Sequence, residues 1–472
     1  MALSSALFSG ISGLNTLGNA MQIIGDNIAN VNTIGFKGAT FTFQDLLSQA
    51  TATMSGTSQV GRGVGLGDIY SSFEQGSFET TGNTTDLAIG GQGFFVVRES
   101  DTENLFYTRA GNFRFDRNGY LINPEGYVVQ GWELDDNGED VGSVTDIRLD
   151  SFTSSPVATS RITIVTNLDS DASSNCADLS LAWDGNNSSG TYMDESNYEY
   201  QSTVKVYDSL GGTHDLTVYY DPTSTSGVWE YIIVCNPDED ERGGSDSDCN
   251  GLLAKGEITF STSEGKVTNI TMYLNDGDGR AAGNWTAASI DSHGYYYFQP
   301  NFGTGTQDIE FDIGTRDSTG GGSGGPTWVN DSLTTTQFAR ASTTTFQSAN
   351  GYGAGDLQGV DVDVDGVITG VYSNGEIIPL FRVALAKFQN INGLLKEGGN
   401  LYRETRESGD AITNRPGTNG LGSIAPNSLE QSNVDIANEF VKMITTQRGF
   451  QANGKIITVT DAMLAELINL KR

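Results

Sequence analysis

The stretch SNVDIANEFVKMITTQRGFQANGKIITVTDAMLAELINLKR, residues 432–472, decides the fold. Its apolar residues recur at alternating steps of four and three, the spacing of a helix that carries a coiled-coil seam. The predicted seam residues are Ile436, Phe440, Met443, Phe450, Ile457, Leu464 and Ile468. A second apolar run lies on a neighbouring face and consists of Ala452, Ile456, Val459, Met463 and Leu467. One partner helix is too little to cover both faces. Ser432 is the predicted N-cap, with Asp435 as its capping-box acid.

The N-terminus repeats this spacing over four heptads. Its predicted seam residues are Leu3, Leu7, Leu14, Leu17, Met21, Ile24, Ile28 and Val31, and Gly10 takes the remaining position. Glycines also interrupt the helix elsewhere, and each costs about 1 kcal/mol of helix stability relative to alanine. Such a helix is unstable alone, so we expect the two chain ends to pair with each other and then with other copies of the chain. The alternative is an intramolecular two-helix hairpin that buries its own seam.

The composition is typical of turn-rich β-structure. The chain has 472 residues with 60 Gly and 9 Pro, a length that favours two to four domains. The formal net charge is −33, and residues 91–325 alone hold 12 basic and 38 acidic side chains. This acidic middle argues against nucleic acid and anionic membrane as partners. No stretch is long enough for membrane insertion.

The pattern along the chain predicts a nested order of domains. Residues 1–33 and 428–472 form a terminal helical coiled-coil domain, and residues 34–75 and 405–427 form an extended connector. Residues 76–155 and 335–404 form an inner β domain, which contains a hairpin with an Asn118-Gly119 turn. Residues 156–334 form an outer, acidic β insert of one or two lobes, which ends at the glycine-rich linker 320–325. The predicted fold class is therefore mixed and mainly β, with paired terminal helices that carry β domains in series.

Few residues are candidates for a metal site or a catalytic site. Asp361, Asp363, Asp365 and Gly366 match the opening of a calcium loop, but the alternating valines favour a strand that runs into a turn. His214 and His293 are the only histidines and lie far apart in the sequence, so we expect neither a metal site nor a catalytic triad. No cofactor and no catalytic residue is predicted. The acidic loop at 238–248 is expected to be solvated surface.

The cysteines and the N-terminal residues indicate whether the protein forms disulfides and how it is exported. Cys176, Cys235 and Cys249 are the three cysteines, and either a Cys235–Cys249 disulfide or unpaired thiols fit the sequence. Residues 1–25 lack a basic n-region and a continuous apolar run, so we expect no cleaved signal peptide.

Several stretches resemble the rod-and-hook axial proteins of the bacterial flagellum, and among them the hook proteins. The N-terminal signature positions are Asn27, Asn30, Thr33, Gly35, Phe36 and Lys37, and the C-terminal ones are Gln447, Arg448, Gln451 and Asn453. Residues 86–96, 107–119, 336–339, 365–375 and 399–402 are similar to the shared β segments, and residues 206–214 to the outer domain of hook proteins. Residues 221–300 depart from the family pattern.

The resemblance implies a structural protein. Its subunits would polymerise into a flexible tubular joint that transmits motor torque from rod to filament. Implied partners are identical subunits, rod and hook–filament junction proteins, and the hook cap and type III export apparatus during assembly. The implied location is extracellular, in the flagellum. Some hook proteins form a lysine–cysteine crosslink between subunits, for which Cys176 is the candidate. The alternatives are a distal-rod-type axial protein with an insert, and a secreted β-rich adhesin or glycan-binding protein.

Overall fold

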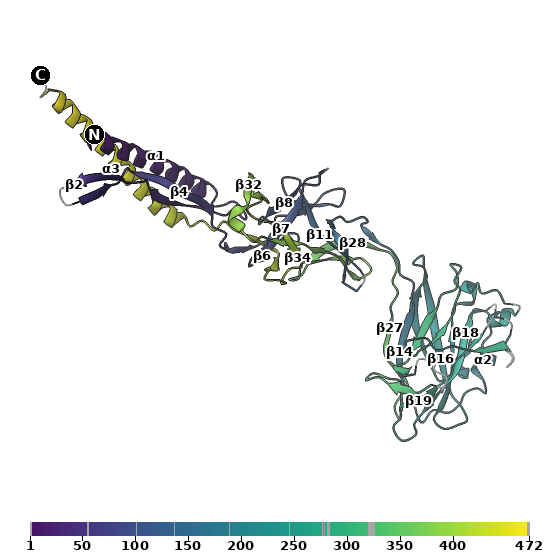
Figure 1. Cartoon of the computed structure of the whole chain (residues 1–472). Helices are drawn as coiled ribbons and strands as arrows, with labels where there is room; N and C mark the ends of the chain where they lie inside the picture. The colour runs from purple at the N-terminus through teal and green to yellow at the C-terminus, as the bar shows by residue number, and fades with distance from the viewer. Residues whose placement is uncertain are drawn as a thin grey trace. The chain divides into compact units, whose positions relative to one another are not determined.

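The computed structural model describes residues 2–469, apart from 54–55, 101, 136, 188, 245, 276, 278, 281–283 and 320–325. Two long helices, α1 (Ala2–Ala29) and α3 (Ile436–Asn469), lie near the two chain ends, and most of the regular structure between them is β (Figure 1). The chain forms two compact units. Unit 1 comprises Met1–Phe152, Leu357–Tyr372 and Glu376–Arg472, and unit 2 comprises Thr153–Asp356 and Ser373–Gly375. The predicted class, mainly β with paired terminal helices, is confirmed.

The helices α1 and α3 pack side by side and run antiparallel (Figure 1). Gly10, near the start of α1, lies against Ile457 in the second half of α3. Asn27, near the end of α1, donates a hydrogen bond to Glu439 in the first turn of α3. The expectation that the two chain ends pair is therefore confirmed within a single chain.

Residues 34–75 hold strands where the sequence predicted an extended connector. The strands are β1 (Ala39–Asp45), β2 (Gln49–Thr53), β3 (Gly56–Val60) and β4 (Val64–Ser71). β1 pairs antiparallel with β4, and β2 pairs antiparallel with β3. β4 also lies along α1, where the Thr16 hydroxyl donates to the Val64 carbonyl at 3.2 Å. The many glycines and serines hid an alternation of Thr and Phe in residues 40–43, which is a strand pattern.

The start of α3 differs from the prediction by one helical turn. The helix begins at Ile436, and the Asp435 carboxylate accepts hydrogen bonds from the backbone N–H groups of Ala437 and Asn438 at 2.8 and 3.3 Å. Asp435 is therefore the N-cap, and Ser432 lies before the helix. Both residue types cap helices well, so the sequence alone could not choose between them.

An antiparallel sheet forms the inner β domain of unit 1. The main strands run in the order β28, β29, β30, β11, β7, β8, β33, β32. Their bounds are β28 (Gly355–Val362), β29 (Val367–Tyr372), β30 (Ile377–Val383), β11 (Val128–Leu134), β7 (Phe94–Arg98), β8 (Leu105–Thr108), β33 (Leu401–Arg403) and β32 (Leu395–Gly398). Branches from this order are β9 (Arg114–Phe115), β10 (Leu121–Ile122), β12 (Asp140–Asp146), β31 (Leu385–Lys387) and β34 (Ile412–Asn414). The core beneath it includes Leu87, Phe95, Val97, Val129 and Leu385.

Two short strand pairs join the first and last parts of unit 1. β5 (Phe78–Thr80) pairs antiparallel with β36 (Ser428–Glu430). β6 (Leu87–Gly90) pairs antiparallel with β35 (Ser423–Pro426). The segments that follow α1 and precede α3 are thus held together next to the inner β domain.

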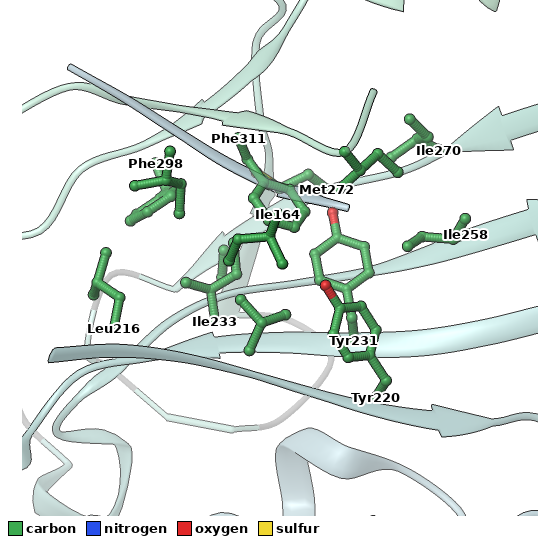
Figure 2. Close-up of a cluster of buried hydrophobic side chains, with 14 of the residues drawn as sticks. Ile164, Leu216, Tyr220, Tyr231, Ile233, Ile258, Ile270, Met272, Phe298 and Phe311 are labelled. Carbon is green, nitrogen blue, oxygen red and sulfur yellow. The ribbon is translucent and has the colours of Figure 1, made fainter. Parts of the chain in front are cut away.

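Two sheets enclose the core of unit 2 (Figure 2). One sheet contains β15 (Tyr200–Tyr207), β16 (Thr213–Pro222), β17 (Val228–Val234), β18 (Leu252–Phe260), β19 (Val267–Ile270), β20 (Tyr273–Asn275) and β21 (Trp285–Ala287). The other contains β14 (Arg161–Asp169), β22 (Tyr296–Phe298), β23 (Ile309–Asp312), β26 (Thr336–Phe338) and β27 (Thr343–Ala349). Outside both sheets are β13 (Thr153–Ser154), the pair β24 (Thr315–Asp317) and β25 (Trp328–Asn330), and the helix α2 (Leu179–Ala182). Ile164, Tyr231 and Phe311 meet between the two sheets (Figure 2).

Unit 2 is longer than the insert predicted at 156–334. It includes β26 and β27, which the sequence analysis assigned to the inner β domain, because both strands pair with β14. The predicted linker 320–325 lies outside the described residues.

Candidate assembly surface on the terminal helices

Small and polar side chains line much of the contact between α1 and α3, where Leu17 of α1 packs on Gly449 and Ile457 of α3 packs on Gly10. The buried line of α1 consists, among its described side chains, of Gly10, Gly13, Thr16, Ala20, Ile24 and Asn27. Among the described side chains of α3, the buried ones are Glu439, Thr446 and Thr460, which lie seven and fourteen residues apart. Asn453 falls in the same series, and a Cβ atom on Gly13 would lie 2.8 Å from its amide nitrogen. The helix backbones therefore approach closely at a line that contains few large apolar side chains.

Most of the predicted seam residues flank this line instead of forming it. In α1, Ile24 is buried and Leu7, Leu14, Leu17, Met21 and Ile28 are half-buried, as is Val31 just after the helix. The side chain of Leu3 lies outside the described residues. In α3, Met443, Ile457 and Leu464 are half-buried, whereas Ile436, Phe440, Phe450 and Ile468 are 45–65% exposed. Pairing within one chain thus leaves most of the apolar surface of α3 in contact with solvent.

The second apolar run of α3 is exposed as well. Its members Ile456, Val459 and Met463 are exposed, while the side chain of Leu467 lies outside the described residues. Val441 and Ile444 continue the exposed apolar surface toward the helix start, and Phe8 and Ile11 are exposed apolar residues of α1. The sequence analysis missed these four residues. Val441 was detectable, since it extends the second run backward across the polar residues at 445 and 448.

The N-terminal signature residues lie at the junction of α1 with the inner β domain. The buried Asn27 side chain exchanges two hydrogen bonds with the backbone of Ala39, at 2.8 and 2.9 Å. Asn30 accepts a hydrogen bond from the Thr33 hydroxyl at 3.1 Å. Phe36 is buried, and the Lys396 ammonium lies 5.6 Å from its ring centroid.

Gly35 and Lys37 complete the N-terminal signature. Gly35 has a φ of +69°, and a Cβ atom there would lie 2.6 Å from the backbone nitrogen of Ala110. This position therefore requires glycine. Lys37 is fully buried and contacts Glu430.

The C-terminal signature residues are divided between contact line and surface. Asn453 donates a hydrogen bond to the Gly449 carbonyl at 3.1 Å and lies against Gly13. Gln447, Arg448 and Gln451 are exposed. These three side chains are therefore available to contacts outside the chain.

The residues considered as candidate calcium ligands, and His214, make contacts within turns and packed side chains of the fold. Asp363, in the turn between β28 and β29, accepts hydrogen bonds from the backbone N–H groups of Asp365 and Val367, so this segment is a strand that runs into a turn. His214 stacks on Phe302 with ring centroids 3.9 Å apart, and its Nδ1 lies 2.6 Å from Glu239.

The other histidine lies in an ion-pair network on the surface of unit 2. His293 Nδ1 is 2.8 Å from Asp291 and 2.7 Å from Glu310. The second oxygen of Glu310 contacts the Arg161 guanidinium at 2.5 Å. Sequence distance concealed this grouping, because β23 brings Glu310 beside the turn that holds Asp291 and His293.

The three cysteines are free thiols. Cys235 and Cys249 are buried, and Cys176 is half-buried. Burial raises the pKa of Cys176 to about 11, and the nearby Asp221 and Glu230 add to the shift. In this folded state Cys176 is therefore mostly protonated at neutral pH and a weak nucleophile.

Comparison with known proteins connects these features to a family. Four family descriptions match the chain in sequence: "Flagella basal body rod protein" at residues 7–37, "Flagellar hook protein FlgE/F/G D1 domain" at 88–174, "Flagellar basal body protein FlaE D2 domain" at 182–352, and "Flagellar basal body rod FlgEFG protein C-terminal" at 425–470. The flagellar hook protein FlgE of Borreliella burgdorferi is 34% identical over 99% of both chains. The chain belongs to the flagellar hook protein FlgE family.

Further relatives agree with this assignment. The FlgE protein of Treponema pallidum is 34% identical over 99% of both chains, and that of Escherichia coli is 29% identical over the whole length of both. The Helicobacter pylori flagellar hook protein FlgE2 aligns in structure with a TM-score of 0.47 and 16% identity, over 75% of this chain and 100% of its own. The sequence relatives confirm the hook-protein interpretation over the rod-type and adhesin alternatives. The family is structural, and its place is the flagellum. In the described part of the chain, no helix is long and apolar enough to cross a membrane.

Proposed function

We propose that the chain is the subunit of a helical tube and that the terminal helices line its inside. The observation that carries this proposal is that α3 contacts α1 with one set of residues and exposes another, apolar set to solvent. On α3, Glu439, Asn453 and Ile457 contact α1, whereas the apolar residues Phe440, Ile444 and Phe450 remain exposed. Exposed apolar surface of this extent on a paired helix marks a contact with other molecules, here other copies of the chain. The predicted seam residues are then subunit contacts.

The acidic middle of the chain supports the second part of the proposal, a flexible joint that transmits torque. Apolar contacts between helices are short-ranged and hold neighbouring subunits in axial register. The outer β domains carry most of the net charge, so their mutual contacts are polar, hydrated and weaker. Such contacts can slide as the tube bends. Rod proteins, hook–filament junction proteins and the hook cap would contact the ends of this tube.

We further propose that the subunit leaves the cell through the type III export apparatus without a cleaved signal peptide, and that its helices become ordered only on assembly. The glycine-interrupted α1 supports this, because such a helix gains little stability from one partner. Circular dichroism and hydrogen exchange on the monomer should show both chain ends unprotected, and polymerisation should protect them. Ends already protected in the monomer would contradict this proposal.

The polymer itself is tested with a matched pair of variants. Concentrated wild-type protein should sediment and show short curved tubes in negative stain. Ile444→Asp places a charge in the exposed apolar surface and should abolish sedimentation, whereas Thr445→Asp, at the adjacent exposed position, should retain it. Thermal unfolding of the β domains should be the same in all three proteins. A monomeric wild type, or an Ile444→Asp variant that forms normal tubes, would contradict the proposal.

A further inference from the structure

Three charged side chains from distant parts of unit 1 meet in its interior. The Lys37 ammonium lies 2.6 Å from Oε1 of Glu430, and Nη1 of Arg109 lies 3.4 Å from Oε2 of the same carboxylate. Lys37 and Glu430 are fully buried, and Arg109 is 4% exposed. Among the ion pairs of the described residues, these two are the most deeply buried. We call the three residues the charge cluster.

Backbone groups from both connecting segments complete the contacts of Glu430 and Lys37. The N–H of Gly76 donates to Oε1 of Glu430 at 2.9 Å, and the N–H of Gly35 donates to the Glu430 carbonyl at 2.7 Å. The Lys37 ammonium donates to the Glu74 carbonyl at 2.8 Å. Glu430 therefore holds the segment after α1, the segment after β4 and its own strand at one point.

Arg109 attaches this point to the inner β domain. Its Nη2 donates to the Gly91 carbonyl at 2.8 Å, and its guanidinium lies 5.4 Å from the ring centroid of the buried Phe94. Its Nε has no hydrogen-bond partner among the described residues. An orphaned buried donor is unfavourable, so this guanidinium is held by the geometry of its neighbours and not by complete hydrogen bonding.

A cluster of this kind is a poor source of stability. Burial lowers the pKa of Lys37 and of Arg109, and attraction to Glu430 only opposes that change. The cost of removing charges from water commonly cancels the attraction between them, and apolar side chains of similar size stabilise as well or better. The charges instead specify how the three segments are oriented, because only one arrangement of these segments pairs both cations with the Glu430 carboxylate.

We propose that Glu430 is a positioning residue that fixes the bases of α1 and α3 on the inner β domain, so that helix pair and domain move as one rigid body. The placement in the chain supports this, since Lys37 follows α1 closely and Glu430 shortly precedes α3. The inference deepens the proposed function and rests on it. Bending of the tube then occurs between subunits and not at this junction.

The test measures orientation and stability separately. Spin labels at Arg117→Cys in the inner β domain and Thr445→Cys on α3, both exposed positions, are introduced in a Cys176→Ser background. Labelled full-length chains are diluted into unlabelled polymer, and the distance distribution between the labels is recorded together with the unfolding midpoint. The compared proteins are the parent, Glu430→Gln, and the apolar triple variant Lys37→Met, Arg109→Met, Glu430→Leu.

The two variants should separate positioning from packing. Glu430→Gln leaves two buried cations without a carboxylate, so the unfolding midpoint should fall and the distance distribution should broaden. The triple variant should regain the midpoint but keep the broad distribution. As a control, Asp146→Asn, at the half-buried Arg98–Asp146 pair of the same domain, should leave the distribution narrow.

A distribution as narrow as the parent's in both cluster variants would overturn the inference, because packing alone would then set the orientation. If the parent failed to polymerise, the proposed function would be contradicted instead. If hydrogen exchange then showed both helices ordered in the monomer, the same labels read on that monomer would still decide whether Glu430 positions the helices.

Discussion

Glu230, on β17, is a carboxyl group that holds its proton unusually tightly. Its Oε2 accepts a hydrogen bond from the backbone N–H of Leu179 at 3.1 Å, and Asp178 and Lys255 interact with it. Burial raises the pKa of Glu230 to about 7, and repulsion from Asp178 adds to this, while the Leu179 hydrogen bond and Lys255 oppose it. The folded protein therefore keeps this proton at pH values where the unfolded chain, with a pKa near 4.5, has lost it.

This difference predicts a pH-dependent stability of unit 2. The contribution of Glu230 is fully present below pH 4.5, declines as the pH rises, and is lost above about pH 7, with a total of at most about 3 kcal/mol. Glu230→Gln should flatten the fall in unfolding midpoint between pH 5 and about pH 8. Glu264→Gln, at an exposed turn, should leave the profile unchanged. Parallel profiles for wild type and Glu230→Gln would contradict the prediction.

The N-cap of α3 gives a prediction at the scale of the element. Asp435→Ala removes the acceptor for two backbone N–H groups and should destabilise the assembled helix by about 1 kcal/mol. Ser432→Ala should cost much less, because Ser432 precedes the helix. The critical concentration for polymerisation of the two variants measures the difference. A larger increase in critical concentration for Ser432→Ala than for Asp435→Ala would instead indicate Ser432 as the N-cap, as predicted from the sequence.

The glycines of α1 differ in what surrounds them. A side chain at Gly13 would push into Asn453, whereas a Cβ atom at Gly18 meets nothing within 4 Å. Gly13→Leu should therefore separate the helices and raise the critical concentration strongly. Gly18→Ala should lower it, since alanine favours the helix by about 1 kcal/mol. If Gly18→Ala blocked polymerisation, the open face of α1 would have to be a site of close backbone approach by a neighbouring copy.

Sequence patterns found the elements better than the partners of individual residues. The heptad spacing predicted both helices and their pairing, and Asn118-Gly119 predicted the turn between β9 and β10. The spacing did not show that small residues such as Gly13 and Thr446 would form the contact within the chain. An apolar pattern predicts which residues become buried, but it does not tell whether the same chain or another copy buries them. Nor could it pair Lys37 with Glu430, since nothing local links residues so far apart.

At the scale of the whole molecule, charge opposes assembly. Residues 91–325 carry 12 basic and 38 acidic side chains, so neighbouring subunits repel each other through their outer parts. Raising the ionic strength from about 0.01 to 0.15 M shortens the screening length from about 30 to about 8 Å. The critical concentration for polymerisation should fall over this range, as measured by sedimentation. Ile444→Asp should not be rescued by salt, because its defect lies in the apolar contact. A salt-independent critical concentration would contradict the prediction.

The pairing of β5 with β36 and of β6 with β35 has a consequence for biosynthesis. Leu87 meets Pro426 across these strands, so the inner domain closes only when the last part of the chain is present. Contacts between such distant residues form slowly and late in folding. A nascent chain still attached to the ribosome thus lacks β35 and β36, and it also lacks α3, against which α1 packs. Synthesis itself delays the moment at which a newly made molecule can join others.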